Sequence, residues 1–251
     1  MTARPLPQKL KKEPLVDAIF EVRFSSSTTA SNVIPGFFFA KLEPKEWVVD
    51  SLPIAEVPSK IRSDDPNLRY QPLMRIHWDN FLILVGDNTL GVACKMPYSG
   101  WSEFRERIIK IIGLLVDAKI VKAFDRYSLK YVDVIEDENL AKQIQMINMD
   151  IRIGSHKLKE EIFTVRLEIP YDIFINVIQI GVPATATMPE GQKRIGALVS
   201  IDTICRHQTN DLIKFTSELP TRLDAIHIEN KKMFFDCLTQ ETIDYLEPVY
   251  G

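Results

Sequence analysis

Hydrophobic and polar residues alternate along several short stretches of this chain, and the first of these stretches lies close to the N-terminus. In residues 20–24 the apolar side holds Phe20, Val22 and Phe24, and the polar side holds Glu21 and Arg23. Successive side chains of a β-strand point to opposite faces, so this alternation predicts a half-buried strand. Residues 123–135 predict a second, longer strand of the same kind.

Three further apolar stretches, residues 73–78, 81–85 and 90–95, follow one another closely. They are separated by Asp79-Asn80 and by Gly86-Asp87-Asn88, which are typical turn residues. Strands joined by such short turns pair with their neighbours in opposite directions. The sequence therefore predicts an antiparallel meander.

Helical spacing replaces the alternation in two places. After residue 100, apolar residues recur every three or four positions, at Trp101, Phe104, Ile108, Ile111, Ile112 and Leu115. This spacing predicts an amphipathic helix that docks on a sheet. In the last part of the chain, Thr221 and Asp224 have the spacing of a capping box, with Asp in place of the usual Glu or Gln, and predict a helix start. Shorter helices are expected over residues 37–42 and up to Ile147.

The remaining segments complete a mixed α+β pattern. Strands are expected over residues 150–153, 163–169, 174–180 and 197–204, whereas 44–66 and 183–192 contain prolines and glycines and are predicted to be irregular. Strands followed by a helix occur twice, which favours antiparallel sheet with amphipathic helices packed on one face. We expect a flexible arm (1–12), an N-terminal α+β half (13–137) and a C-terminal α+β half (138–251), similar to each other or joined into one compact domain.

Composition narrows the class of protein. The chain has 251 residues, 45% of them hydrophobic and 26% charged, which is typical of a globular protein. Its net charge of −3 gives no general attraction to nucleic acid. We expect no signal peptide and no membrane span, because no apolar run approaches about 20 residues. Three widely spaced cysteines favour buried, reduced thiols and a cytoplasmic location.

Several catalytic motifs are missing from the sequence. It contains no phosphate-binding Gly-x-x-x-x-Gly-Lys, no dinucleotide Gly-x-Gly-x-x-Gly, no Gly-x-Ser-x-Gly elbow and no His-Glu-x-x-His or Cys-x-x-Cys. We therefore expect no catalytic residue, no metal and no cofactor. One weak alternative is the pair Cys205 and His207, which would share a strand face and either contact a metal or form a nucleophile pair. Trp101 either staples its helix to the sheet or lines a pocket.

The charged residues of the predicted strands are the best candidates for a binding site. Arg23, Arg75, Lys130 and Arg166, together with Glu21 and Glu168, all alternate with apolar neighbours. On one sheet they would form a polar face or a groove for an anion such as a nucleotide. The commoner interpretation is the solvated face of an antiparallel sheet.

Four segments carry a family resemblance: residues 14–24, 97–104, 126–131 and 227–246. Together they resemble a sporadically distributed, uncharacterised bacterial protein family of about this length, whose third segment usually has Arg where this chain has Lys130. The resemblance covers nearly the whole chain but implies no activity and no catalytic residues. Patchy distribution implies genes that move between genomes, including accessories of defence or toxin–antitoxin systems.

These observations leave two hypotheses of different classes. The first is a non-catalytic binding or protein-interaction module, acting on a protein partner or as a homodimer. The second is an enzyme or sensor that binds a nucleotide or another anion through the strand-borne basic residues. Convergence of those residues in space would favour the second hypothesis.

Overall fold

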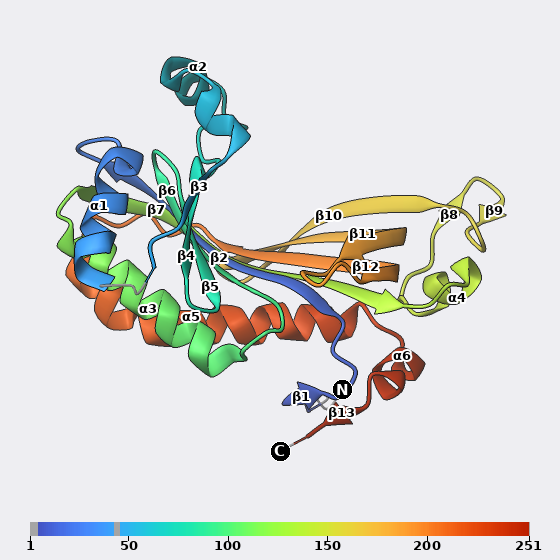
Figure 1. Cartoon of the computed structure of the whole chain (residues 1–251). Coiled ribbons are helices and arrows are strands. Elements are labelled where there is room, and N and C mark those ends of the chain that lie inside the picture. The colour runs from blue at the N-terminus through green and yellow to red at the C-terminus, as the bar shows by residue number, and fades with distance from the viewer. Residues whose placement is uncertain (1–4, 43–45, 251) are drawn as a thin grey trace. The chain divides into compact units, whose positions relative to one another are not determined.

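The computed structural model describes residues 5–42 and 46–250. It divides the chain into two compact units (Figure 1). Unit 1 comprises Met1–Asp17, Lys130–Thr203 and Ile226–Gly251, and unit 2 comprises Ala18–Leu129 and Ile204–Ala225. The units are thus interleaved along the chain, unlike the contiguous halves 13–137 and 138–251, which stay a prediction. Residues 1–4 of the expected arm and 44–45 of the expected irregular segment lie outside the described residues, as does residue 43.

The fold is α+β, with nine strands in one antiparallel sheet. Their hydrogen-bonded order is β10-β11-β12-β7-β2-β6-β5-β4-β3. Three of these strands, and helix α5, have residues in both units: β2 (Leu15–Ser26), β7 (Val121–Glu136), β12 (Lys193–Cys205) and α5 (Leu212–Asp236). Alternation along β2 and β7 predicted both strands, and the structure extends each by a few residues.

Unit 2 contains the predicted meander. Its strands and helices are α1 (Ala30–Leu42), β3 (Val49–Ser51), the 3₁₀ turn η1 (Pro53–Glu56), α2 (Ser59–Asp64), β4 (Met74–Trp78), β5 (Phe81–Val85), β6 (Thr89–Cys94) and α3 (Trp101–Asp117). Neighbouring strands β3, β4, β5 and β6 pair antiparallel. Helix α1 packs against β5 and α3, and α3 packs against β6. The expected short helix at 37–42 is longer in the structure, since α1 begins at Ala30 and continues through Pro35 and Gly36.

Unit 1 holds the remaining elements (Figure 1). They are β1 (Lys9–Leu10), α4 (Leu140–Gln145), β8 (Arg152–Ile153), β9 (His156–Lys157), β10 (Phe163–Tyr171), β11 (Phe174–Thr187), α6 (Gln240–Tyr245) and β13 (Pro248–Val249). Strand β1 pairs with β13, so the two ends of the chain lie side by side. Strand β11 continues to Thr187, into the segment expected to be a loop. An aliphatic core of β11 and β12 residues packs with residues of α5 and α6.

Helix α5 begins earlier than predicted. The side chain of Asp211 accepts a hydrogen bond from the Lys214 amide at 2.9 Å, which caps the helix start. Thr221 and Asp224 lie well inside the helix, as does Pro220. Asp224 instead accepts hydrogen bonds from Trp101 Nε1 at 3.1 Å and Arg105 Nη2 at 2.9 Å. The capping-box prediction was therefore wrong, and Trp101 staples α3 to α5 within unit 2.

Within the described residues, no helix is both long enough and apolar enough to cross a membrane.

Candidate functional site

One row of side chains crosses the face of the unit 2 sheet that the helices leave open. Strand register places Asp50 opposite Arg75, Arg75 opposite Leu84, Leu84 opposite Gly91, and Gly91 opposite Glu21. Directly opposed residues of an antiparallel pair point to the same face. We call these five residues the open-face row. The adjacent row points inward, and its members Ile76, Ile83, Val92 and Phe20 are fully buried.

Glu21 ends the row on β2 and gathers two guanidinium groups. Its Oε1 atom accepts a hydrogen bond from Arg23 Nε at 2.7 Å and another from Arg126 Nη2 at 3.1 Å. The guanidinium of Arg23 also lies 4.3 Å from the centre of the Tyr70 ring. Two cations share one carboxylate here, so this end of the row has one net positive charge.

Asp50 ends the row on β3 in a similar way. Its Oδ2 atom lies 2.6 Å from Arg75 Nε and 2.9 Å from His77 Nε2. The hydrogen bonds from His77 and then Arg75 lower the pKa of Asp50, although exposure to solvent limits their contribution to stability. Residues 49–51 were expected to be irregular, so the sequence did not identify Asp50 as the partner of Arg75.

The centre of the row is apolar and only partly accessible to solvent. Leu84 is half-buried, and Gly91 beside it is buried and has no side chain. A Cβ atom at Gly91 would lie 3.1 Å from the Phe20 carbonyl oxygen and 3.3 Å from Leu84 Cβ, so the close approach of these strands favours glycine. The open-face row therefore has an apolar centre between two clusters of ion pairs.

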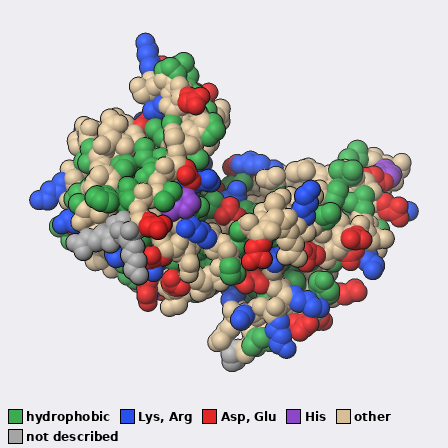
Figure 2. Space-filling view, in the orientation of Figure 1, with side chains coloured by type: hydrophobic (Ala, Val, Ile, Leu, Met, Phe, Trp, Pro, Cys, Tyr) green, Lys and Arg blue, Asp and Glu red, His purple; other side chains and the backbone are tan. Residues whose placement is uncertain are grey.

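The structure distributes the six predicted binding residues over both units. Glu21, Arg23 and Arg75 belong to unit 2, whereas Lys130, Arg166 and Glu168 belong to unit 1. Arg166 Nη2 and Glu168 Oε1 are 2.8 Å apart on β10. Basic and acidic side chains are likewise interspersed over the visible face of the molecule (Figure 2). Three of the four basic candidates are thus bonded to a carboxylate, and convergence of all six stays a prediction.

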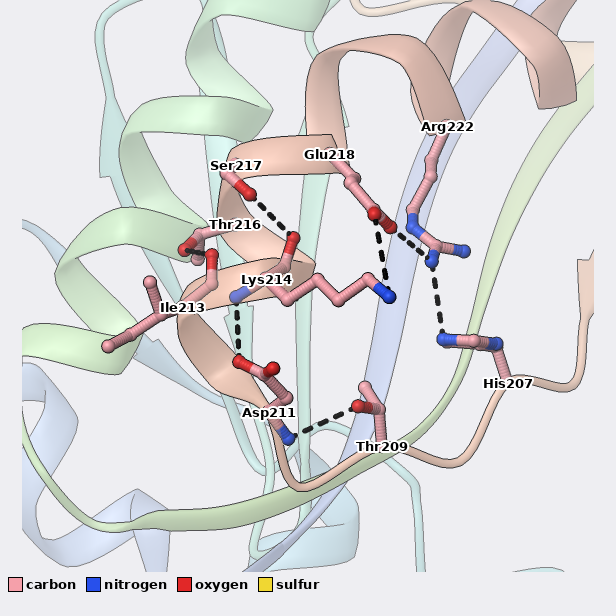
Figure 3. Close-up of polar contacts among 9 residues, drawn as sticks. All are labelled: His207, Thr209, Asp211, Ile213, Lys214, Thr216, Ser217, Glu218 and Arg222. Atoms are coloured by element: carbon pink, nitrogen blue, oxygen red, sulfur yellow. Dashed lines mark hydrogen bonds and ion pairs between the residues drawn. The ribbon is translucent and has the colours of Figure 1, made fainter.

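The thiol and the imidazole of the Cys205–His207 pair have different partners, and Figure 3 shows the contacts of His207. His207 Nε2 lies 3.3 Å from Arg222 Nη2, and the same guanidinium nitrogen donates to Glu218 at 2.7 Å. Cys205 is hydrogen-bonded with Tyr127 instead, and burial raises the pKa of its thiol. Desolvation, followed by the charge of Arg222, lowers the pKa of His207. A buried neutral thiol without an adjacent base is a poor nucleophile, so the nucleophile reading is not supported.

A buried polar network in unit 1 was not predicted from the sequence. Asn176 Nδ2 donates to Glu229 Oε1 at 2.8 Å, and Thr203 Oγ1 donates to Asn176 Oδ1 at 2.7 Å. Asn230 Nδ2 donates to Thr203 Oγ1 and to the Ile201 carbonyl oxygen, each at 3.0 Å. The one sequence signal was Asn176 itself, which occupies the apolar phase of its strand between Phe174 and Ile178.

Among residues 5–42 and 46–250, no group of three His, Cys, Asp or Glu side chains is placed to hold a metal ion. A comparison with models of protein families gives no match. A comparison with curated proteins gives no match either.

Proposed function

We propose that this chain is a non-catalytic protein-interaction module and that the open-face row of unit 2 contacts its protein partner. The observation that carries the proposal is the order of the row, in which Leu84 and Gly91 lie between Asp50–Arg75 and Glu21. Protein interfaces commonly combine an apolar centre with a polar rim rich in arginine. We also propose that this partner belongs to a mobile defence module. This part of the proposal rests on the family resemblance.

Anion binding is the second candidate function, and the Glu21 cluster favours it. Arg23 and Arg126 together carry one more charge than Glu21 neutralises, and Arg23 stacks on an aromatic ring. A phosphate group would bind there through bidentate guanidinium contacts. It would compete with a carboxylate that both arginines already contact, and for this reason we rank anion binding second.

Matched surface variants test the proposal. We expect Leu84→Glu to abolish capture of a specific protein from the source cells, because the charge lies at the centre of the row. Arg75→Ala is a milder second variant that leaves the apolar centre intact and should weaken capture. The control is Ser102→Glu, which adds the same charge at an exposed position on α3. Thermal unfolding of each variant shows whether the fold is retained.

A thermal-shift series with ATP, GTP, inorganic phosphate and polyphosphate separates the two candidates. A ligand that binds only the folded state raises its unfolding temperature. Interaction with a protein predicts no such rise. A rise produced by any of these anions, and removed by Arg23→Ala with Arg126→Ala, would overturn the proposal in favour of anion binding.

A further inference from the structure

Strand β10 in unit 1 ends the nine-stranded sheet. It pairs on one side with β11, from Phe163 opposite Val182 to Tyr171 opposite Phe174, and among the described residues no strand pairs with its other side. An edge strand presents a row of backbone donors and acceptors that another strand can join.

The turn after β10 shows which backbone groups point outward. Tyr171 and Phe174 flank a two-residue turn that starts at Asp172, with a φ of 50°. The flanking residues of such a turn are hydrogen-bonded to each other. Because pairing alternates along an antiparallel ladder, the amides of Thr164, Arg166 and Glu168 face the open edge, as do the carbonyls of these residues and of Pro170. Pro170 fits this assignment, since proline has no amide to give to the inner ladder.

One face of this edge strand is apolar, and the other face carries the charged residues Arg166 and Glu168. Phe163 and Val165 pack against the unit 1 core. The next residues on the same face are well exposed, with relative accessibilities of 49% for Leu167, 39% for Ile169 and 50% for Tyr171. Isolated edge strands commonly avoid such exposure with charges, short length or bulges. The exposed apolar side chains of β10 therefore indicate a surface that is covered by another strand in an assembly.

We propose that β10 pairs antiparallel with β10 of a second copy of this chain, about a twofold axis through Leu167. In this register Arg166 lies opposite Glu168 of the partner subunit, and Glu168 lies opposite the partner's Arg166. These positions are the ones whose backbone groups face outward, so each opposed pair exchanges two ladder hydrogen bonds. The Thr164 amide donates to the carbonyl of the partner's Pro170. Because proline has no N–H, the return hydrogen bond to the Thr164 carbonyl is missing from this pair.

The side chains complement one another in the same register. On one face, Leu167 meets the partner's Leu167, and Val165 meets the partner's Ile169. On the other face, the Arg166–Glu168 ion pair, 2.8 Å long and about half exposed, becomes part of a quartet of alternating charges. A twofold interface requires a surface that complements itself, and this strand does so in both charge and apolar pattern. A second copy is therefore a better partner than an unrelated strand. The inference concerns unit 1 and does not depend on the open-face row.

Charge variants on β10 provide the test by sedimentation equilibrium over a range of protein concentrations. We expect a reversible dimer for the wild type. Arg166→Glu and Glu168→Arg should each weaken dimerisation at least about tenfold, because like charges then face each other across the axis. The double variant, with both charges exchanged, should restore it. Both side chains are about half exposed, so the fold should tolerate each change.

Mixing the two single variants gives the sharpest result. A strand with two acidic residues complements one with two basic residues, so the mixture should form heterodimers more tightly than either variant forms homodimers. A wild type that stays monomeric at high concentration would overturn the proposal. Dimerisation that is unaffected by the single changes would overturn it as well, because the register predicts direct charge contacts.

Discussion

The layers between sheet and helices differ between the two units. In unit 2 aromatic rings meet one another. Phe104 lies 6.2 Å from both Phe81 and Trp101, and Phe124 lies 4.3 Å from Phe215, measured between ring centres. In unit 1 the core is mainly aliphatic, with Phe234 and Phe235 as its two buried rings, and it adjoins the buried network of Asn176, Thr203, Glu229 and Asn230. Contacts between rings tolerate small shifts, whereas directional hydrogen bonds hold one alignment of helix and strand. We therefore expect unit 2 to depend on buried volume and unit 1 on the completeness of its network.

The largest effect is expected from removing a ring in unit 2. Phe104→Ala deletes a fully buried side chain and should lower the free energy of unfolding by about 3–5 kcal/mol. Denaturant unfolding measures the loss, and hydrogen exchange should show it first in α3 and the meander. Ser102→Ala, at an exposed site on the same helix, serves as the control. A loss below about 1 kcal/mol for Phe104→Ala would contradict the dependence on buried volume.

Breaking the unit 1 network should lower the free energy of unfolding by a smaller amount. The loss should depend on which hydrogen-bonding groups are removed rather than on the volume of the side chain. Asn176→Ala leaves the Glu229 carboxylate and the Thr203 hydroxyl without their common partner, which should cost about 2 kcal/mol. Glu229→Gln is the matched control, because it keeps an oxygen that accepts from Asn176. If the two variants unfold at the same denaturant concentration, the network does not act as a unit.

Local pattern was enough to predict most of the elements. The meander strands β4, β5 and β6 match their predicted ranges within one residue at each end, because turn residues and alternation both lie within a few positions. Helix α3 was predicted as well, from its single apolar stripe. Helix α5 was misplaced because Pro220 and the Thr221–Asp224 spacing imitate a helix start, while the true cap at Asp211 has no comparable motif.

The candidate sites depend on contacts between distant segments. Asp50 and Arg75 are 25 positions apart, and Glu21 and Arg126 are 105 positions apart. Alternation predicted that Glu21, Arg75 and Arg126 lie on the polar side of their strands. It predicted no strand at Asp50, and it does not specify strand order or register. The pairing of each arginine with a carboxylate therefore could not be predicted from the sequence. Asn176 was predictable in principle, since a polar residue in the apolar phase of a strand requires a buried partner.

The smallest effect per measured step, at most about 1.4 kcal/mol for each pH unit, concerns how the units respond to pH. Asp133 on β7 is buried, and burial, with a smaller contribution from the charge of Glu13, raises its pKa to about 8. An unfolded aspartate has a pKa of about 3.9, so the folded state holds an additional proton between these values. Stability contributed by the protonated carboxyl is therefore complete below pH 4 and is lost as the pH rises toward 8. His207 in unit 2 has a lowered pKa and acts in the opposite direction, with stability lost as the pH falls below about 6.5.

Replacing Asp133 with Asn removes the titration while nearly keeping the shape of the protonated acid. The wild type should lose at most about 1.4 kcal/mol per pH unit through this group between pH 4 and 8, and Asp133→Asn should lack that component of the slope. Denaturant unfolding of both proteins at one-unit pH steps measures the difference. The two curves should meet near pH 4 and separate as the pH rises, with the variant the more stable. Parallel curves would mean that Asp133 is ionised in the folded protein. Unit 1 would then contain a buried carboxylate anion instead of a buried neutral carboxyl group.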